Sequence, residues 1–319
     1  MPRGPARRYG IAEWYGHDIM LLARDQRRAF AEQAYAERNR ESPAVMPCPY
    51  LNSLRAGALC NKSGGVCSTR PYTVGEKGEG VPGDGMVTLC PNRFLEGAVL
   101  LKWVATVMLG SSDGILAVKE TPFLRRTGVA VDAEEESRAG RIDWIFVDPA
   151  TLNTQQLRWC ALETQSLYFS GHNMTDDFQR YATSETLIYP TRGRRPDYRS
   201  GGPKRLSPQL AIKVPLLARW GIKSAVLVDR YFFNEMSELR EITYGGDDDR
   251  LAEAEIVWFI CDYSDDGQLL PGDVRYCSLA DSITALNAAQ PIALGQLVGY
   301  LGRTVAAPRN QHTNVFTLS

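Results

Sequence analysis

Two stretches of the sequence decide the fold: RIDWIFV at residues 141–147 and LRWCALETQSLYF at residues 157–169. Both are rich in aromatic and aliphatic residues, and the first is bounded by Gly140 and Pro149. These features are typical of β-strands. We therefore expect one strand over residues 142–147 and another over residues 157–169.

Acidic side chains lie inside both expected strands. Asp143 lies in the first strand, and Glu163 lies in the second, two residues before Gln165. Side chains alternate between the two faces of a strand, so Glu163 and Gln165 project from the same face. If the strands pair with Asp143 on that face, two carboxylates and one amide converge at one point. The alternative is that Glu163 pairs with an arginine and Asp143 caps a turn.

Outward from these strands, helical and strand patterns are mixed along the chain. The mixture favours an α/β fold with a small cysteine-bearing insertion near its start. The first forty residues have an arginine-rich helical pattern, and the stretch from Pro190 to Pro208 is basic and loop-like. We expect further helices over residues 94–109, 209–220 and 279–289, and further strands over residues 225–233 and 255–261.

Composition and charge exclude several classes of protein. Of 319 residues, 44% are hydrophobic and 23% charged, which is typical of a globular protein and excludes a disordered or fibrous one. The 36 basic and 37 acidic residues leave a net charge of −1. Overall charge therefore does not attract nucleic acid, although a local basic patch still can. No segment approaches the roughly 20 apolar residues that cross a bilayer, so we expect no membrane association.

Seven cysteines occur without an export signal. An odd number in such a chain argues for a reducing compartment, so we expect a cytoplasmic protein. Four of them fall within the loop-rich segment 43–91, where four thiolates can hold a Zn²⁺ or Fe ion and stabilise a segment without periodic apolar residues. The alternative is four unrelated buried cysteines. These four are Cys48, Cys60, Cys67 and Cys90, and the other three, Cys160, Cys261 and Cys277, are expected in the core.

Two carboxylates and an amide at one point suit the hydrolysis of a phosphodiester. Mg²⁺ takes oxygen ligands from one or two carboxylates and completes its shell with water and phosphate. Bound there, it activates a water and neutralises charge on the reacting phosphate. In the commonest nuclease pattern, D…(D/E)xK, a lysine stands where this chain has Gln165. The glutamine amide can position water or phosphate by hydrogen bonds, but it carries no charge.

The carboxylate strands and the cysteine segment together resemble the NotI-like type II restriction endonucleases. The resemblance covers scattered blocks in about the first 175 residues, and the intervals between the cysteines and the shorter chain depart from the family. Besides the two strands, it rests on Trp14-Tyr15-Gly16-His17, Cys48-Pro49, Gly65-Val66-Cys67, Cys90-Pro91-Asn92-Arg93 and Phe169-Ser170-Gly171-His172.

The resemblance implies an α/β fold with a PD-(D/E)XK restriction-endonuclease-like core, in which helices flank a mixed central sheet, over residues 93–319. It implies a helical region with a small four-cysteine metal-binding module over residues 1–92. It also implies a homodimer that cuts double-stranded DNA at a GC-rich palindrome, with a cognate DNA methyltransferase as companion. The residues that it assigns are Cys48, Cys60, Cys67 and Cys90 for one Fe or Zn ion, Asp143 and Glu163 for Mg²⁺, and Gln165 as the third catalytic residue.

Two further groups of residues are candidates for the site. Glu96 and Glu120 are candidates for a third carboxylate, with a purely structural partnership as the alternative for each. The basic stretch at about residues 190–208 is a candidate for DNA contact, because arginine and lysine neutralise phosphates and arginine reads guanine. The alternative is a solvated loop. Its basic residues are Arg192, Arg194, Arg195, Arg199, Lys204 and Arg205.

The sequence thus predicts a Mg²⁺-dependent type II restriction endonuclease. One alternative is a non-catalytic, metal-stapled, sequence-specific DNA-binding protein, in which Asp143 and Glu163 are only structural. That protein would bind DNA without metal-dependent cutting. Another alternative is an iron–sulfur redox protein that uses the same cysteines, but the pair of acid-bearing strands has no purpose in it.

Overall fold

The computed structural model describes residues 8–41, 43, 45–125, 138–154, 156–171, 174–289, 292–306 and 315. Residues up to Asn287 form one compact unit, and those from Ala288 onward form a second unit. The second unit contains one described helix, α10 (Leu294–Ala306). Among the described residues, every helix is too short or too polar to cross a membrane.

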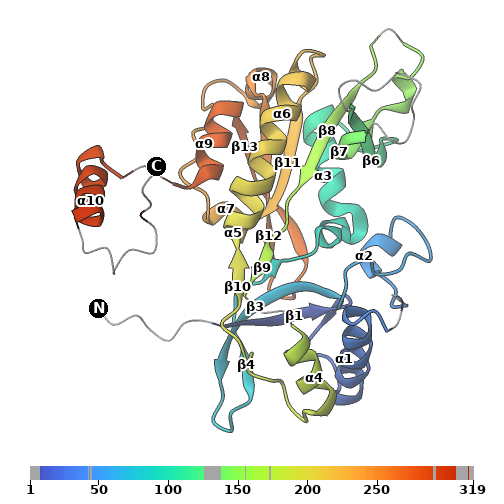
Figure 1. Ribbon diagram of the computed structural model, residues 1–319. Coiled ribbons are helices and arrows are strands. Elements are labelled where there is room, and N and C mark those ends of the chain that lie inside the picture. Colours follow the sequence, from blue (N-terminus) through green and yellow to red (C-terminus); the bar gives the residue numbers. More distant parts are fainter. Residues whose placement is uncertain are drawn as a thin grey trace. The chain divides into compact units, whose positions relative to one another are not determined.

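A mixed six-stranded sheet forms the centre of the first unit (Figure 1). Its strands lie in the order β13-β12-β11-β8-β7-β6. The pairs β8–β11 and β11–β12 are parallel, and the other neighbours are antiparallel. The α/β fold with a mixed central sheet is therefore confirmed. The strands are β6 (Leu116–Arg125), β7 (Arg138–Val147), β8 (Trp159–Thr164), β11 (Ser224–Asp229), β12 (Ile256–Tyr263) and β13 (Leu269–Cys277).

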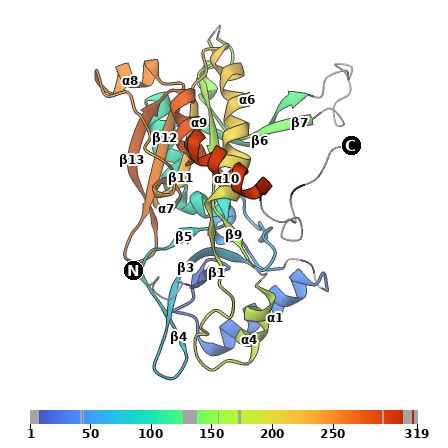
Figure 2. The same ribbon diagram turned by 60° about the vertical axis from the view of Figure 1, so that its left-hand side comes forward.

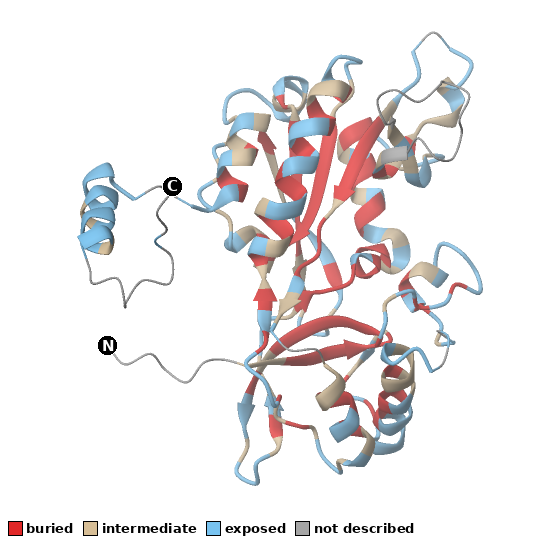
Figure 3. Cartoon of the chain, viewed as in Figure 1, coloured by how far each residue is buried: buried red, intermediate tan, exposed pale blue. Residues whose placement is uncertain are grey.

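Helices cover both faces of this sheet. Consecutive side chains of a strand point to opposite faces, and two neighbours on β12 show which helices lie on each. The Trp258 indole donates a hydrogen bond to Ser282 of α9 (Leu279–Asn287), 3.0 Å away, whereas the Phe259 ring meets Trp103 of α3 (Val99–Leu109) edge-on at 4.9 Å. Helix α6 (Ser207–Ala218) lies beside α9 (Figure 2). The strands between these layers are buried, as Figure 3 shows.

A second sheet occupies the N-terminal part, where the first forty residues were expected to be helical. That expectation is wrong for β1 (Arg8–Trp14) and β2 (His17–Asp18) and right for α1 (Arg24–Arg38). The segment RYGIAEW forms a strand because it pairs with β3 (Val66–Val74), and this tertiary pairing outweighs local propensity. Trp14 at its end stacks on Phe178 of α4 (Thr175–Thr183) with ring centroids 5.5 Å apart.

Segment 43–91 is held by strand pairing. It was expected to lack a core of its own and to need another anchor. Its strand β3 pairs with β1, with β4 (Gly80–Pro82) and with β5 (Val87–Thr88). Backbone hydrogen bonds and the buried residues of β3 thus provide the anchor that the sequence pattern did not reveal.

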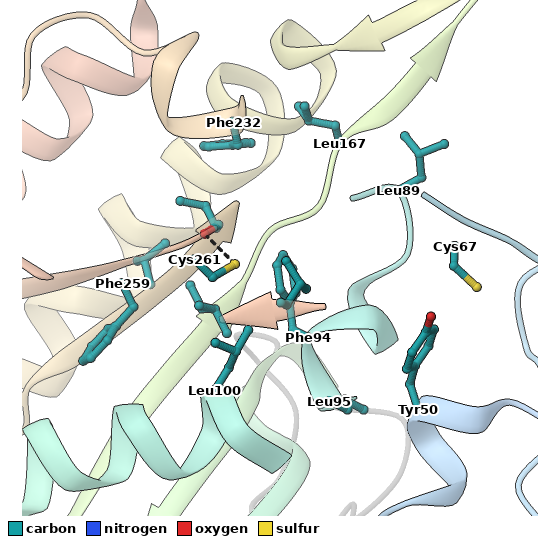
Figure 4. Close-up of a cluster of buried hydrophobic side chains, with 14 of the residues drawn as sticks. Tyr50, Cys67, Leu89, Phe94, Leu95, Leu100, Leu167, Phe232, Phe259 and Cys261 are labelled. Atoms are coloured by element: carbon teal, nitrogen blue, oxygen red, sulfur yellow. Dashed lines mark hydrogen bonds between the residues drawn. The ribbon is translucent and has the colours of Figure 1, made fainter. Parts of the chain in front are cut away.

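One core cluster joins the two sheets (Figure 4). Phe94 comes from the 3-10 helix η1 (Pro91–Ala98) and lies near Cys261 of β12, whose thiol donates a hydrogen bond to the Val228 carbonyl at 3.3 Å. Tyr50 and Cys67 belong to the same cluster on the N-terminal side. The short elements that remain are α2 (Pro49–Asn52), η2 (Pro149–Thr151), β9 (Tyr168–Ser170), β10 (Arg195–Asp197), α5 (Tyr198–Gly201), η3 (Gly202–Leu206), α7 (Arg230–Asn234) and α8 (Asp247–Glu253).

Several expected boundaries differ from the observed ones. The helix expected over 94–109 begins as an α-helix only at Val99, because Gly97 and Ala98 have φ angles of 55° and 56°. The strand expected over 157–169 divides into β8 and β9. The expected loop over 190–208 contains β10, α5 and η3, and the strand expected over 225–233 ends at Asp229, where α7 follows.

Candidate active site

The strands β7 and β8 separate where their acidic residues lie. The last backbone pair is Trp144 with Leu162. Beyond it, side chains take over the hydrogen bonding: Asp143 Oδ2 accepts the N–H of Thr164 at 2.9 Å and its hydroxyl at 3.0 Å. In return, the Asp143 N–H donates to the Glu163 carboxylate. The two carboxylates are therefore fixed to each other's strand at the point where the sheet opens.

Asp143, Glu163 and Gln165 line one cavity of about 420 Å³. The structure thus brings together the three residues that alternation along the strands predicted to converge. The Gln165 N–H donates to the Leu227 carbonyl of β11 at 3.0 Å, which holds this residue beside the end of β8. Other side chains that line the cavity are Lys62, Asn92, Lys119, Glu120, Tyr168, Arg205 and Gln209.

Glu163 has the most perturbed carboxyl group of this site. Only 5% of the residue is exposed. Burial, and secondarily the charge of Asp143, raise the pKa of Glu163 from 4.5 to about 7, while Lys213 opposes the shift. Lys213 Nζ donates to Glu163 Oε1 at 2.7 Å and to Gln209 Oε1 at 3.2 Å. Two acids close to each other and facing a cavity form a place where a cation is stabilised.

The sequence reasoning missed Lys213 and Gln209, which both lie on α6. A signal for Lys213 was present, because a lysine among apolar residues at helical spacing is unusual. Leu210, Val214 and Leu217 share its buried face of the helix. Lysine at such a position needs a buried acid as partner, and Glu163 is that acid.

The two candidates for a third carboxylate lie in different places. Glu120 lines the cavity with Asp143, whereas Glu96 lines another cavity and forms an ion pair with Arg93 at 2.6 Å. The interpretation of Glu96 as a member of this site is therefore not supported. Glu120 has a φ of 53° in the middle of β6, a strained value of the kind that concentrates at functional sites. Its carboxylate is half-exposed and forms an ion pair with Arg141 at 3.0 Å.

The sequence model of the NotI restriction endonuclease family matches residues 30–276. The chain belongs to this family. It is therefore a restriction endonuclease, a site-specific deoxyribonuclease, and DNA is the substrate of its family. No curated protein matches the chain. Family membership favours the nuclease interpretation over the non-catalytic DNA-binding protein and over the iron–sulfur redox protein.

In this NotI-family chain, the basic residues of the stretch 190–208 do not share one environment. Arg194 is fully buried and forms an ion pair with Asp177, so it does not offer its guanidinium to DNA at a surface. Arg192 is exposed and pairs with Asp176 at 3.3 Å. Arg205 is the one of these residues that reaches the cavity, and the exposed side chains of Arg195, Arg199 and Lys204 do not line it.

Arg205 is positioned by an aromatic residue. Its guanidinium lies 4.3 Å from the centre of the Tyr168 ring, and its Nη1 donates to the Tyr168 hydroxyl at 2.6 Å. The π face and the hydroxyl fix an exposed arginine that would otherwise sample many rotamers. Arg205 is thus held at the cavity mouth with donors left for an anion.

The four N-terminal cysteines of this nuclease are buried but not assembled as metal ligands. Burial, with smaller contributions from the neighbouring Cys90 and Cys48, raises the pKa of Cys60 to about 11. Burial, and secondarily Cys90, raise the pKa of Cys67 well above its ordinary value in the same way. Within the described part of the chain, no three or more His, Cys, Asp or Glu side chains form a group that could hold a metal ion. The expected four-cysteine cluster is therefore not seen among the described residues.

The other three cysteines lie where they were expected. Cys160, Cys261 and Cys277 are buried in or beside the central sheet. Burial raises the pKa of Cys160 and Cys277 to about 12. These thiols stay protonated at neutral pH and behave as small core residues.

Proposed function

We propose that this NotI-family chain is a type II restriction endonuclease that hydrolyses phosphodiester bonds of double-stranded DNA with the help of Mg²⁺. The observation that carries the proposal is the convergence of Asp143, Glu163 and Gln165 at one cavity, where β7 and β8 separate. Carboxylate oxygens are the ligands that Mg²⁺ prefers, and one or two of them suffice when water and phosphate complete the shell.

Asp143 and Glu163 would hold the Mg²⁺ ion. The ion would supply an activated water and a positive charge at the reacting phosphate. Glu163 must be ionised to act as a ligand, and Lys213 is the buried cation that favours this form. Gln165 would orient the water or the phosphate by hydrogen bonds, and it cannot accept a proton because its amide is neutral.

Two further side chains at the cavity suit the same reaction. Glu120 lies on β6 opposite Asp143, because Lys119 pairs with Trp144 and Thr121 with Ile142 on either side. A water-mediated contact from its carboxylate would suit the outer shell of the ion. Arg205 at the cavity mouth would bind a DNA phosphate next to the one that reacts.

The oligomeric state, the DNA target and the companion enzyme that we propose come from the family resemblance. A homodimer would place one active site on each strand of a palindrome, since the symmetry of the protein then matches the symmetry of the DNA. We propose a GC-rich palindrome as target and a cognate DNA methyltransferase that protects the host. The division of the chain at residues 92 and 93 into a cysteine-bearing module and a catalytic core stays a prediction.

Cleavage assays test this function directly. Purified protein is incubated with plasmid and bacteriophage DNA of known sequence, with Mg²⁺ or with EDTA, and the fragment ends are sequenced. We expect discrete Mg²⁺-dependent fragments that share one GC-rich palindromic end, and no fragments from Asp143→Ala or Glu163→Ala. Specific binding without cleavage under every condition would instead identify a non-catalytic DNA-binding protein, with Gln165 as the mark of an inactive site.

Although the described thiols do not form a metal site in the structure, we also propose, from the family resemblance, that Cys48, Cys60, Cys67 and Cys90 hold one Fe or Zn ion with a structural role. The support is that all four thiols are buried and near one another, and that backbone N–H groups face their sulfurs, as that of Leu51 faces Cys48 Sγ at 3.5 Å. A cation would displace the protons that burial otherwise retains on the thiols.

Elemental analysis of the purified protein tests this metal site. We expect one Fe or Zn per chain, lost in Cys67→Ser together with thermal stability. Ligand identity does not separate the two metals, so the measured element decides between them. Acid-labile sulfide would point to an iron–sulfur cluster, and a metal-free protein of full stability would contradict the site.

A further inference from the structure

The chain lacks a lysine on the strand of its candidate active site, and helix α6 supplies one from another direction. Lys213 lies behind Glu163, with only 5% of the residue exposed, and its Nζ lies 2.7 Å from Glu163 Oε1. Gln209, one helical turn earlier, accepts a second hydrogen bond from the same Nζ at 3.2 Å. Glu163 and Gln209 line the cavity, whereas Lys213 does not. Lys213 therefore acts on the cavity through these two side chains.

Burial of Lys213 costs free energy, because its charged group is removed from water. A buried ammonium group loses its hydration, and removal of one partner from a buried ion pair leaves an uncompensated charge. Its ion-pair partner among the described residues is Glu163, and apolar residues of α6 flank it on both sides. A fold that needed only to fill this space would place an apolar side chain here.

The contact fixes the orientation of the Glu163 carboxylate. One of its oxygens is held by Lys213, and the Asp143 N–H donates to the same carboxylate. The group cannot rotate without breaking these bonds. Such outer contacts orient metal-binding side chains, and their loss typically lowers metal affinity 10- to 100-fold.

We propose that Lys213 is a positioning residue of this nuclease. It holds Glu163 in the orientation that binds the divalent cation, and it provides from α6 the positive charge that Gln165 does not provide from the strand. Gln209 keeps the ammonium group in place. This inference rests on the proposed function, because it assumes that Asp143 and Glu163 hold the cation.

The decisive variant is Lys213→Met, which keeps the length of the side chain and removes its charge. The matched control is Lys223→Met, because the partly buried Lys223 donates to backbone carbonyls, such as that of Ala254, and to no described residue that lines the cavity. We expect Lys213→Met to raise the half-saturating Mg²⁺ concentration for cleavage at least about tenfold. The DNA affinity of Lys213→Met in EDTA should equal that of the parent. Lys213→Arg should have a half-saturating Mg²⁺ concentration between those of the parent and Lys213→Met.

A second readout does not depend on cleavage. Binding of Mn²⁺ to the protein without DNA is followed by the loss of the free-ion paramagnetic resonance signal, and Lys213→Met should weaken it by a similar factor. If Lys213→Met does not fold, Gln209→Leu provides the test, with an expected shift of at least about threefold in the same direction.

The outcomes separate the two proposals. A parent protein that neither cleaves DNA nor binds Mn²⁺ would overturn the proposed function itself. A parent that cleaves, together with a folded Lys213→Met that has the same Mg²⁺ and Mn²⁺ dependence, would overturn only the role of Lys213. If Lys213→Met and Lys223→Met shift the dependence equally, the effect is structural and the role is also rejected.

Discussion

Two glutamates of this molecule are buried to almost the same degree, yet their surroundings differ. Glu13 of β1 is 6% exposed and accepts hydrogen bonds from three side chains. These donors are Arg93 Nε at 2.9 Å, the Tyr50 hydroxyl at 2.8 Å and the Ser68 hydroxyl at 2.6 Å. The Glu13 carboxylate is thus saturated within the protein, and it joins β1, β3 and η1.

Glu163 is 5% exposed but has a different set of neighbours. One ammonium group, Lys213, and one backbone N–H, Asp143, donate to it, and the carboxylate of Asp143 adds a negative charge beside it. Glu163 lines the cavity of the candidate active site, whereas Glu13 lines a separate cavity together with Arg93. The comparison shows that burial alone does not mark a functional acid. An incompletely satisfied acid next to a like charge does.

The largest expected difference between the two glutamates is in catalysis. Glu163→Gln should lower the cleavage rate about 10³-fold, because a metal ligand is lost, which corresponds to roughly 4 kcal/mol of transition-state stabilisation. Glu13→Gln should cleave at the rate of the parent once the rate is divided by the folded fraction. Single-turnover cleavage of a plasmid at saturating Mg²⁺ measures both. Equal losses in the two variants would remove the distinction between them.

The second difference is in stability, where Glu13→Gln should have the larger effect of the two variants. Glu13→Gln leaves the buried guanidinium of Arg93 with the partly exposed Glu96 as its remaining ion-pair partner, so we expect a loss of about 3 kcal/mol in the free energy of unfolding. Glu163→Gln also leaves a buried cation, Lys213, without its ion-pair partner, but it removes the repulsion with Asp143, so we expect a smaller loss at pH 8 than for Glu13→Gln. Guanidinium denaturation measures these free energies. Strong destabilisation by Glu163→Gln would show that its pairing with Lys213 is mainly structural.

Much of the catalytic strand pair could be predicted from the sequence. The alternation of Asp143, Glu163 and Gln165 is a property of local geometry, and the structure places all three at one cavity. The buried cysteines of the core followed from their apolar neighbours in the same way. These features depend on residues close together in the sequence.

The rest could not be predicted because it depends on contacts between distant segments. Most of β1 is a strand through its pairing with β3, some 55 residues later in the chain. Strand β13 was missed because Pro271 and Gly272 interrupt its pattern, and helix α10 was missed although Leu294, Leu297, Val298 and Leu301 recur at helical spacing. Lys213 reaches Glu163 from 50 residues away. The buried ion pair of Arg194 with Asp177 likewise cannot be predicted from the basic composition of residues 190–208.

A third way to sharpen the comparison is the pH dependence of stability in EDTA. Because the pKa of Glu163 is raised from 4.5 to about 7, the folded protein retains a proton between these values that the unfolded chain has lost. The free energy of unfolding should therefore fall, by up to about 3 kcal/mol, as pH rises through this window. Glu163→Gln should lack this fall, whereas Glu13→Gln should retain it. Thermal unfolding at pH 5, 6, 7 and 8 follows it, and identical profiles for parent and Glu163→Gln would contradict the assignment.

Mg²⁺ should act against this loss of stability. The cation competes with the proton for Glu163, so it should raise the melting temperature more at pH 8 than at pH 5. Glu163→Gln should show little stabilisation by Mg²⁺ at either pH. A stabilisation that is independent of pH would show that Glu163 is not among the ligands.

The smallest expected effect concerns the exposed acid of the site, Glu120. Its φ of 53° is strained for a residue with a Cβ atom and relaxed for glycine. We expect Glu120→Gly to raise the free energy of unfolding by about 0.5 kcal/mol, because the relief of strain exceeds the added chain entropy of the unfolded state. Glu120→Ala retains the strain and should not be stabilised, and its lost ion pair with Arg141 is exposed and contributes little.

Both variants remove the Glu120 carboxylate, so both should cleave more slowly at limiting Mg²⁺ if the strained backbone serves to hold this carboxylate beside Asp143. Stabilisation by glycine with unchanged cleavage would instead mean that the backbone strain is unrelated to the site, and that Asp143 and Glu163 alone distinguish this region from the saturated carboxylate of Glu13.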